Sequence, residues 1–165
     1  MFELKRISRE GIPEALSKAH RYRLLNDPAL AESICHDVLA IDAGNQEALI
    51  TLILALTDQL GRGPSGHHAR ELIPRLEGEY DRAYYSGLIA ERMACAHMRQ
   101  GTPGSSFTAY EAFREAMSWY ERAEAIRPQG NDDAILRWNT CARILMRHTD
   151  LRPRPEEAYE PVLED

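Results

Sequence analysis

Cysteine is scarce in this chain, and the three that occur form no recognisable pattern. They lie far apart, at Cys35, Cys95 and Cys141, and no Cys-x-x-Cys pair is present. An odd and dispersed set argues against a disulfide framework, and the neighbouring His36 and His97 are too few to complete a zinc site. We therefore expect three small buried thiols in a reducing compartment, with no metal and no cofactor.

Long apolar runs are also missing. The longest, residues 48–56, is interrupted by Thr51 and is far too short to cross a bilayer. Residues 1–11 contain no apolar stretch of signal-peptide length. The formal net charge of −6 disfavours a general electrostatic attraction to nucleic acid. The sequence thus predicts a soluble cytoplasmic protein that has neither membrane nor nucleic acid as a partner.

Catalytic motifs are absent as well. The sequence has no glycine-rich phosphate loop, no Gly-x-Ser-x-Gly and no His-Glu-x-x-His. The adjacent His67 and His68 would point to different faces of a helix, so they cannot bind one metal ion together. We predict that the chain is not an enzyme, and we assign no catalytic or metal-binding residue.

What the chain does have is helical periodicity divided by strong breaks. At 165 residues, with 44% hydrophobic and 28% charged residues, it has the size and composition of one globular domain. Proline, glycine and Asn-Asp steps separate the periodic segments. The prediction is an all-α chain of about seven helices, near residues 14–25, 28–41, 46–60, 67–77, 78–101, 105–126 and 132–147.

The clearest pattern runs from Ala116 to Pro128. Ala116, Tyr120, Ala123 and Pro128 are spaced by four, three and five residues, which places two small residues and one aromatic on a helix face before a turn. This spacing resembles the second helix of a tetratricopeptide repeat. The resemblance implies a right-handed α-solenoid of antiparallel helical hairpins with a concave face.

Weaker copies of the spacing begin at Ala31 and Ala69. The copies starting at Ala31, Ala69 and Ala116 are 38 and 47 residues apart (69 − 31 and 116 − 69), against about 34 residues in an unbroken array. Long loops are rare in compact domains, so we expect the extra residues to lengthen the helices at 78–101 and 105–126. Residues 1–150 form the predicted repeat domain.

The resemblance implies a non-catalytic scaffold or adaptor that binds a partner protein or peptide on its concave face. Members of the family that clamp carboxylates hold the end of a peptide with asparagine and basic side chains, because arginine grips a carboxylate through two hydrogen bonds. A partner with an acidic segment is therefore implied. Counting along the resembling repeats places Asp58, Arg99, Asn139 and Arg143 on this face, and Glu91 lies on the same stretch as Arg99. The predicted partner-binding residues are therefore Asp58, Glu91, Arg99, Asn139 and Arg143.

The register of the last helix leaves an alternative open. The same count puts Arg137 where the family buries a leucine, and Trp138 where it has a glycine. A shift by one residue would move Asn139 inward and leave a solvated arginine face. In either register Trp138 lies on the apolar stripe, so we expect it to be buried.

Two other functions stay open. The chain would be a structural oligomerisation subunit if it self-associates. It would be an enzyme if Glu91, Cys95, His97 and Arg99 formed a pocket in the third hairpin, which comprises the helices expected at 78–101 and 105–126.

Residues 151–165 form a predicted acidic tail that contains Pro153, Pro155 and Pro161. The tail is expected either to stay disordered or to reach the concave face of its own or a neighbouring chain near Arg99 and Arg143.

Overall fold

The structure is a computed structural model that describes residues 1–61 and 65–155. In these residues the chain is all-helical, with seven α-helices, which confirms the predicted all-α class and the prediction of about seven helices. The elements are η1 (Arg9–Gly11), α1 (Ile12–Leu24), α2 (Pro28–Ile41), α3 (Gln46–Asp58), α4 (Ser65–Leu72), η2 (Ile73–Arg75), α5 (Glu79–Gln100), α6 (Ser105–Ala125) and α7 (Asp133–Arg147). Not one of the described helices combines the length and the apolar character needed to cross a membrane.

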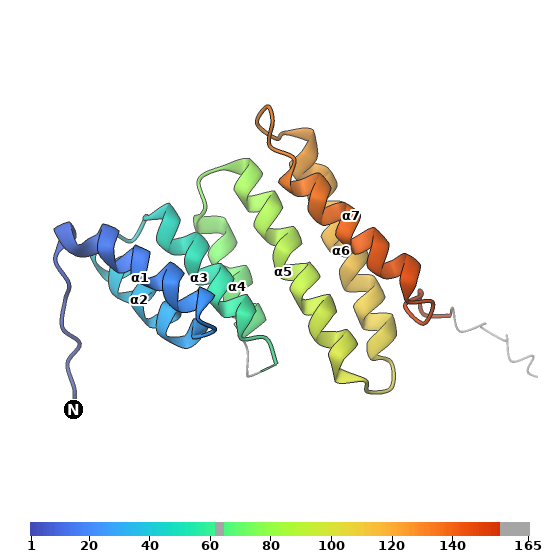
Figure 1. Cartoon of the computed structure of the whole chain (residues 1–165), viewed down its shortest axis with the longest axis horizontal. Coiled ribbons are helices and arrows are strands. Elements are labelled where there is room, and N and C mark those ends of the chain that lie inside the picture. The colour runs from blue at the N-terminus through green and yellow to red at the C-terminus, as the bar shows by residue number, and fades with distance from the viewer. Residues whose placement is uncertain (62–64, 156–165) are drawn as a thin grey trace, which may run out of the picture.

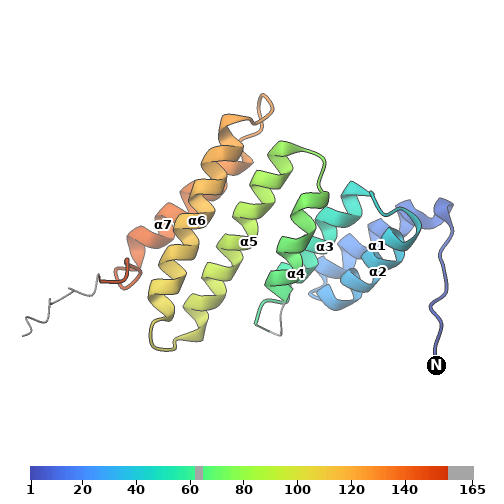
Figure 2. The same ribbon diagram turned by 180° about the vertical axis from the view of Figure 1, so that it is seen from behind.

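The helices alternate between two layers. In Figure 1 α1, α3, α5 and α7 lie nearer the viewer, whereas α2, α4 and α6 are nearer when the molecule is seen from behind (Figure 2). Consecutive helices pack on one another from α1 to α4 and again from α5 to α7, and α5 joins the two sets through α3 and α4. The N-terminus and α7 therefore lie at opposite ends of the molecule.

The core is divided in the same way along the chain. One cluster of buried residues joins α1 to α4 and takes in Ile89 of α5, and a smaller one lies where α1, α2 and α3 meet. Another cluster joins α5, α6 and α7. Leu151 is buried in this last cluster, so packing continues one residue past the predicted domain boundary at 150.

Local signals explain most helix ends. Asp27 accepts a hydrogen bond from the backbone N–H of Leu30 at 3.2 Å, and Pro28 occupies the first turn of α2. Asn45 caps α3 in the same way through the N–H of Ala48, at 2.9 Å. Gly101 ends α5 with a φ of 62°, a left-handed conformation that glycine adopts without strain.

The helix expected at 67–77 contains Pro74, which predicts a kinked or shortened helix. This is confirmed: α4 ends at Leu72, because Pro74 lacks the N–H that an α-helix needs there and the chain tightens into η2. Serine commonly caps helices, so the sequence also predicts a cap from Ser105 or Ser106, and this prediction is wrong. Gly104 holds the cap position of α6 with a φ of 81°, and both serines lie inside the first turn.

The longest helices, α5 with 22 residues and α6 with 21, confirm that the extra residues of the third hairpin extend its helices. They approach closely at Gly87. A Cβ atom added there would lie 2.7 Å from the Tyr120 ring and 3.2 Å from the carbonyl oxygen of Ala116. Because Gly87 has no side chain, the ring of Tyr120 can pass over α5 at this point, toward the opposite face of that helix.

Candidate functional site

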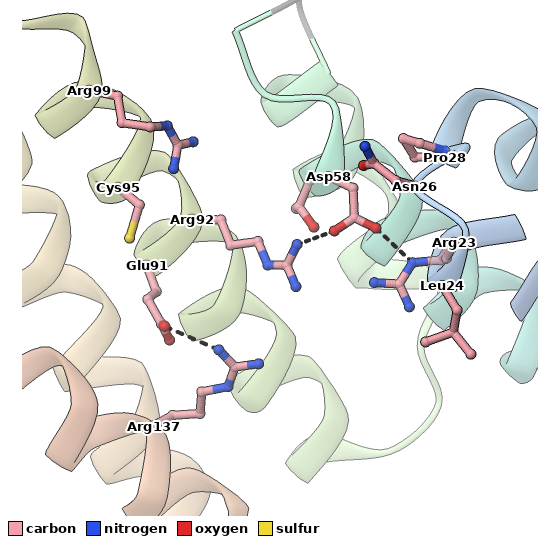
Figure 3. A pocket seen from close by; sticks show the side chains of 11 residues that line it. Arg23, Leu24, Asn26, Pro28, Asp58, Glu91, Arg92, Cys95, Arg99 and Arg137 are labelled. Atoms are coloured by element: carbon pink, nitrogen blue, oxygen red, sulfur yellow. Dashed lines mark hydrogen bonds and ion pairs between the residues drawn. The ribbon is translucent and has the colours of Figure 1, made fainter. Parts of the chain in front are cut away.

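A concave pocket with a volume of about 510 Å³ opens on the α1–α3–α5–α7 layer (Figure 3). Its walls come from the ends of α1 and α3, the turn between α1 and α2 with the first residue of α2, the second half of α5 and the first half of α7. We call it the arginine groove; it is lined by Arg23, Leu24, Asn26, Pro28, Thr57, Asp58, Glu91, Arg92, Cys95, Arg99 and Arg137.

Asp58, at the end of α3, lies between two arginines of the groove (Figure 3). One carboxylate oxygen accepts a hydrogen bond from Nε of Arg23 at 2.8 Å, and the other accepts from Nη1 of Arg92. The three side chains are between 19% and 27% exposed, so water screens these pairs less than a surface ion pair. The cluster links α1, α3 and α5 across the groove.

Glu91 is the second carboxylate, and its side chain is only 7% exposed. Oε1 accepts a hydrogen bond from Nη1 of Arg137 at 3.1 Å, and Oε2 accepts one from the hydroxyl of Tyr120 at 2.5 Å. A buried carboxylate is tolerated only when it is paired in this way. Glu91 therefore connects the α5–α6 core to the floor of the groove.

The ionisation of this network follows from its burial. Burial is the largest single influence on the pKa of Arg137 and would lower it. The Glu91 carboxylate, together with Tyr84 and Tyr120, outweighs burial and raises that pKa, so the guanidinium stays charged. Burial, with a second contribution from Glu91, raises the pKa of Tyr120. Tyr120 thus remains a hydrogen-bond donor to Glu91 across the physiological pH range.

The groove carries a surplus of positive charge. Four arginines face two carboxylates, a formal charge of +2 in a chain whose net charge is −6. Both carboxylates already accept hydrogen bonds from arginine. Arg99 is exposed and, within the described part of the chain, has neither an ion pair nor a hydrogen bond. Guanidinium groups of the groove therefore keep free donors, and these suit an anionic group.

Cys95 faces the groove and is half-buried, whereas Cys35 and Cys141 are buried. The expectation of three buried thiols therefore fails at Cys95. Burial, and then the neighbouring Glu91, raises the pKa of Cys95, so its thiol stays protonated and is a weak nucleophile at neutral pH. His97 does not line the groove; its Nδ1 lies 3.3 Å from Oε1 of Gln100.

The five predicted partner-binding residues are only partly brought together. Asp58, Glu91 and Arg99 line the groove, whereas Asn139 and Arg143 do not. Asn139 is half-buried on α7 and Arg143 is exposed.

The orientation of α7 about its own axis explains why Asn139 and Arg143 do not line the groove. Arg137 points toward α5, and successive residues of an α-helix are about 100° apart, which places Asn139 about 200° and Arg143 about 240° round the axis from it. The predicted register is therefore wrong for α7: the side chain assigned to a buried leucine position lines the groove.

Sequence reasoning missed Arg23, Arg92 and Arg137. One signal for Arg92 was present, because Arg92, Cys95 and Arg99 are spaced by three and four residues and so share a face of α5. Nothing in the sequence pairs Arg23 with Asp58, since 35 residues separate them.

Trp138 is half-buried, so the prediction of a fully buried ring is wrong. It packs at the edge of the buried cluster that joins α5, α6 and α7, which we call the α5–α7 cluster. Its indole Nε1 donates a hydrogen bond to Oε1 of Glu121 at 3.0 Å. The predicted docking of the tail concerns residues 156–165, which lie outside the described residues.

In residues 1–61 and 65–155, no three His, Cys, Asp or Glu side chains are grouped so that they could hold a metal ion. Comparisons of the chain with protein-family models, with curated proteins and with solved structures gave no match. The functional inference below therefore rests on the geometry and charge of the groove.

Proposed function

We propose that this chain is a non-catalytic protein-interaction module, a scaffold or adaptor, that receives an acidic segment of a partner protein in the arginine groove. One observation carries the proposal. Arginines from α1, α5 and α7 converge on a groove that has only two carboxylates of its own, both already bound. A negatively charged segment is the complementary ligand.

The arrangement of the helices supports the same proposal. Consecutive helices alternate between two layers, as a right-handed, tetratricopeptide-like array of hairpins requires. The groove lies on the layer of α1, α3, α5 and α7, which contains the first helix of each such hairpin. A concave face of this kind presents several helices at once to an extended peptide.

Arg99 is the first contact that a ligand carboxylate would make, because its guanidinium is exposed and uncommitted among the described side chains. Arg92 and Arg137 are already hydrogen-bonded to Asp58 and Glu91, yet a guanidinium has five N–H donors and retains some for a second acceptor. The bound carboxylate would therefore lie over α5, between Arg99 and these two pairs.

A labelled synthetic peptide with the sequence of residues 156–165 serves as an acidic probe. We expect it to bind, and we expect binding to weaken as salt rises, because Arg99 is exposed and screened. Arg99→Glu should weaken binding about tenfold, whereas the same change at Arg114, an exposed arginine of α6 away from the groove, should not.

Two results would contradict the proposal. One is equal binding of the acidic peptide by the protein and its Arg99→Glu variant. The other is equal binding of a peptide in which the five acidic residues are replaced by their amides, since the groove would then not recognise charge.

A further inference from the structure

A second groove lies between η2 and the end of α6, over the first two turns of α5. Its α6 wall belongs to the layer opposite the arginine groove, the layer nearer the viewer when the molecule is seen from behind (Figure 2). Its volume is about 640 Å³. We call it the apolar groove, because most of the side chains that line it are apolar: Ile73, Pro74, Ala83, Trp119, Ala125 and Ile126. Ile126 is 43% exposed, so the groove presents apolar surface to water.

The rim of the apolar groove carries one charge of each sign that has no ion-pair partner among the described residues. The guanidinium of Arg122 lies over the Trp119 ring, 4.6 Å from its centroid, and within residues 1–61 and 65–155 it has no carboxylate partner. Glu79 likewise forms no ion pair with a described residue. Arg82 is occupied, because it donates to the carbonyl oxygens of Leu76 and Glu77.

The N-terminal arm, residues 1–7, is a projecting segment, whereas the apolar groove is concave. Phe2 and Leu4 project from it with 103% and 91% exposure. Its base is fixed, because Arg6 and the following Arg9 donate hydrogen bonds to the last carbonyls of α2, at 3.4 and 3.2 Å. The arm therefore holds two large apolar side chains in water at a defined place on the molecule, which is unfavourable unless something covers them.

Arm and groove also match in chemistry. In an extended segment alternate side chains share a side, so Phe2 and Leu4 point one way and Glu3 and Lys5 the other. When the two apolar side chains enter the apolar groove, Glu3 and Lys5 start from its open side. Their long side chains bend back to the rim and there reach the free charges, the guanidinium of Arg122 and the carboxylate of Glu79.

The arm and the groove of one chain do not meet. In both views the arm descends along the outer side of the α1–α2 end of the molecule, at the opposite end from α6 and α7 (Figures 1 and 2). We propose that the N-terminal arm of one copy of this chain docks in the apolar groove of a second copy. Because the contact joins two different surfaces, a reciprocal exchange of arms closes a dimer and a one-way exchange builds longer chains.

Sedimentation velocity of the full chain over a wide range of concentration tests this proposal. We expect the mass to rise with concentration, whether to a dimer or to longer chains. The double variant Phe2→Ser/Leu4→Ser removes the anchors, and Ala125→Glu places a charge on the floor of the groove. Each should shift association to at least about tenfold higher concentration, since each removes apolar burial from the contact.

A matched control separates docking from a general loss of apolar surface. Met146 of α7 is 80% exposed and lies in neither groove, so Met146→Ser should associate as the unmodified chain does. The sites in the arm and at residue 125 are exposed, so their variants should keep the melting temperature of the unmodified chain.

A charge exchange tests the contact itself. Glu3→Arg should weaken association, and adding Arg122→Glu should restore it, which a merely sticky surface would not do. A chain that remains monomeric at every concentration would overturn the proposal. Association that survives both the arm variant and the groove variant would overturn it equally.

Discussion

Arg137 of α7 donates a hydrogen bond to Glu91 of α5 at 3.1 Å, and both side chains line the arginine groove. The two partners are unequal, because the side chain of Glu91 is 7% exposed and that of Arg137 is 34% exposed. Loss of the arginine would leave a buried carboxylate with only the Tyr120 hydroxyl. Loss of the glutamate would leave a cation that water still reaches.

The first prediction follows from this inequality. Arg137→Met should lower the free energy of unfolding by about 1–3 kcal/mol, because it strands the charge of Glu91. Adding Glu91→Gln should recover part of that loss, so the double variant is more stable than the sum of the single effects predicts. Urea unfolding measures the free energy of unfolding of the two single variants and of the double variant, with Arg114→Met as an exposed control. If the effects of the two substitutions simply add, the coupling between Arg137 and Glu91 is contradicted.

A second prediction concerns the close approach of α5 and α6. Alanine normally stabilises a helix relative to glycine, but a Cβ atom at Gly87 would meet the Tyr120 ring at 2.7 Å and backbone at 3.2 Å. Gly87→Ala should therefore cost about 1–3 kcal/mol. Gly44→Ala is the matched control, since nothing lies within 4 Å of its added Cβ, and thermal melting should show little change there. A Gly87→Ala chain as stable as the unmodified one would show that the helices can separate freely.

The third prediction separates two aromatic residues by burial. Phe113 is completely buried in the α5–α7 cluster, and Phe113→Ala should cost about 3–5 kcal/mol. Trp138 is half-buried, so Trp138→Ala should cost about half as much, and Trp138→Phe, which keeps an aromatic ring but loses the bond to Glu121, less again. Chemical denaturation ranks the three variants. A Trp138→Ala effect as large as that of Phe113→Ala would mean that the indole is more deeply packed.

The fourth prediction is a loss of stability in alkali. Burial raises the pKa of Cys35 and Cys141 from 9.0 to about 12, and that of Tyr85 from 10.0 to about 12. The unfolded chain releases these protons first, so between pH 9 and 12 the folded state holds more of them. The contribution is complete below about pH 9, and the free energy of unfolding should fall as the pH rises toward 12.

Urea denaturation at a series of pH values checks the alkaline slope. The double variant Cys35→Ala/Cys141→Ala should fall less steeply between pH 9 and 12, even if it starts from a lower stability. An unchanged slope would mean that the two thiols do not contribute to the pH dependence.

The sequence by itself determined the helices. Asp27 and Pro28 start α2, and Gly101 ends α5, because each acts on backbone groups within one turn of itself. The hydrophobic period of 3.6 residues marked the buried faces for the same local reason. Asp58 and Arg99 could be predicted on one face, because the resemblance to a helical repeat supplied an order for the helices, and both line the arginine groove.

Only the tertiary structure decided how charges meet across helices. Arg23 and Asp58 are 35 residues apart, and Glu91 and Arg137 are 46 apart, so their pairing depends on the rotation of each helix about its axis. That rotation is set by packing, such as the approach of Tyr120 over Gly87. A periodic sequence fixes which residues share a face of one helix, but the face that each helix turns toward its neighbour is a balance of contacts summed over the whole core.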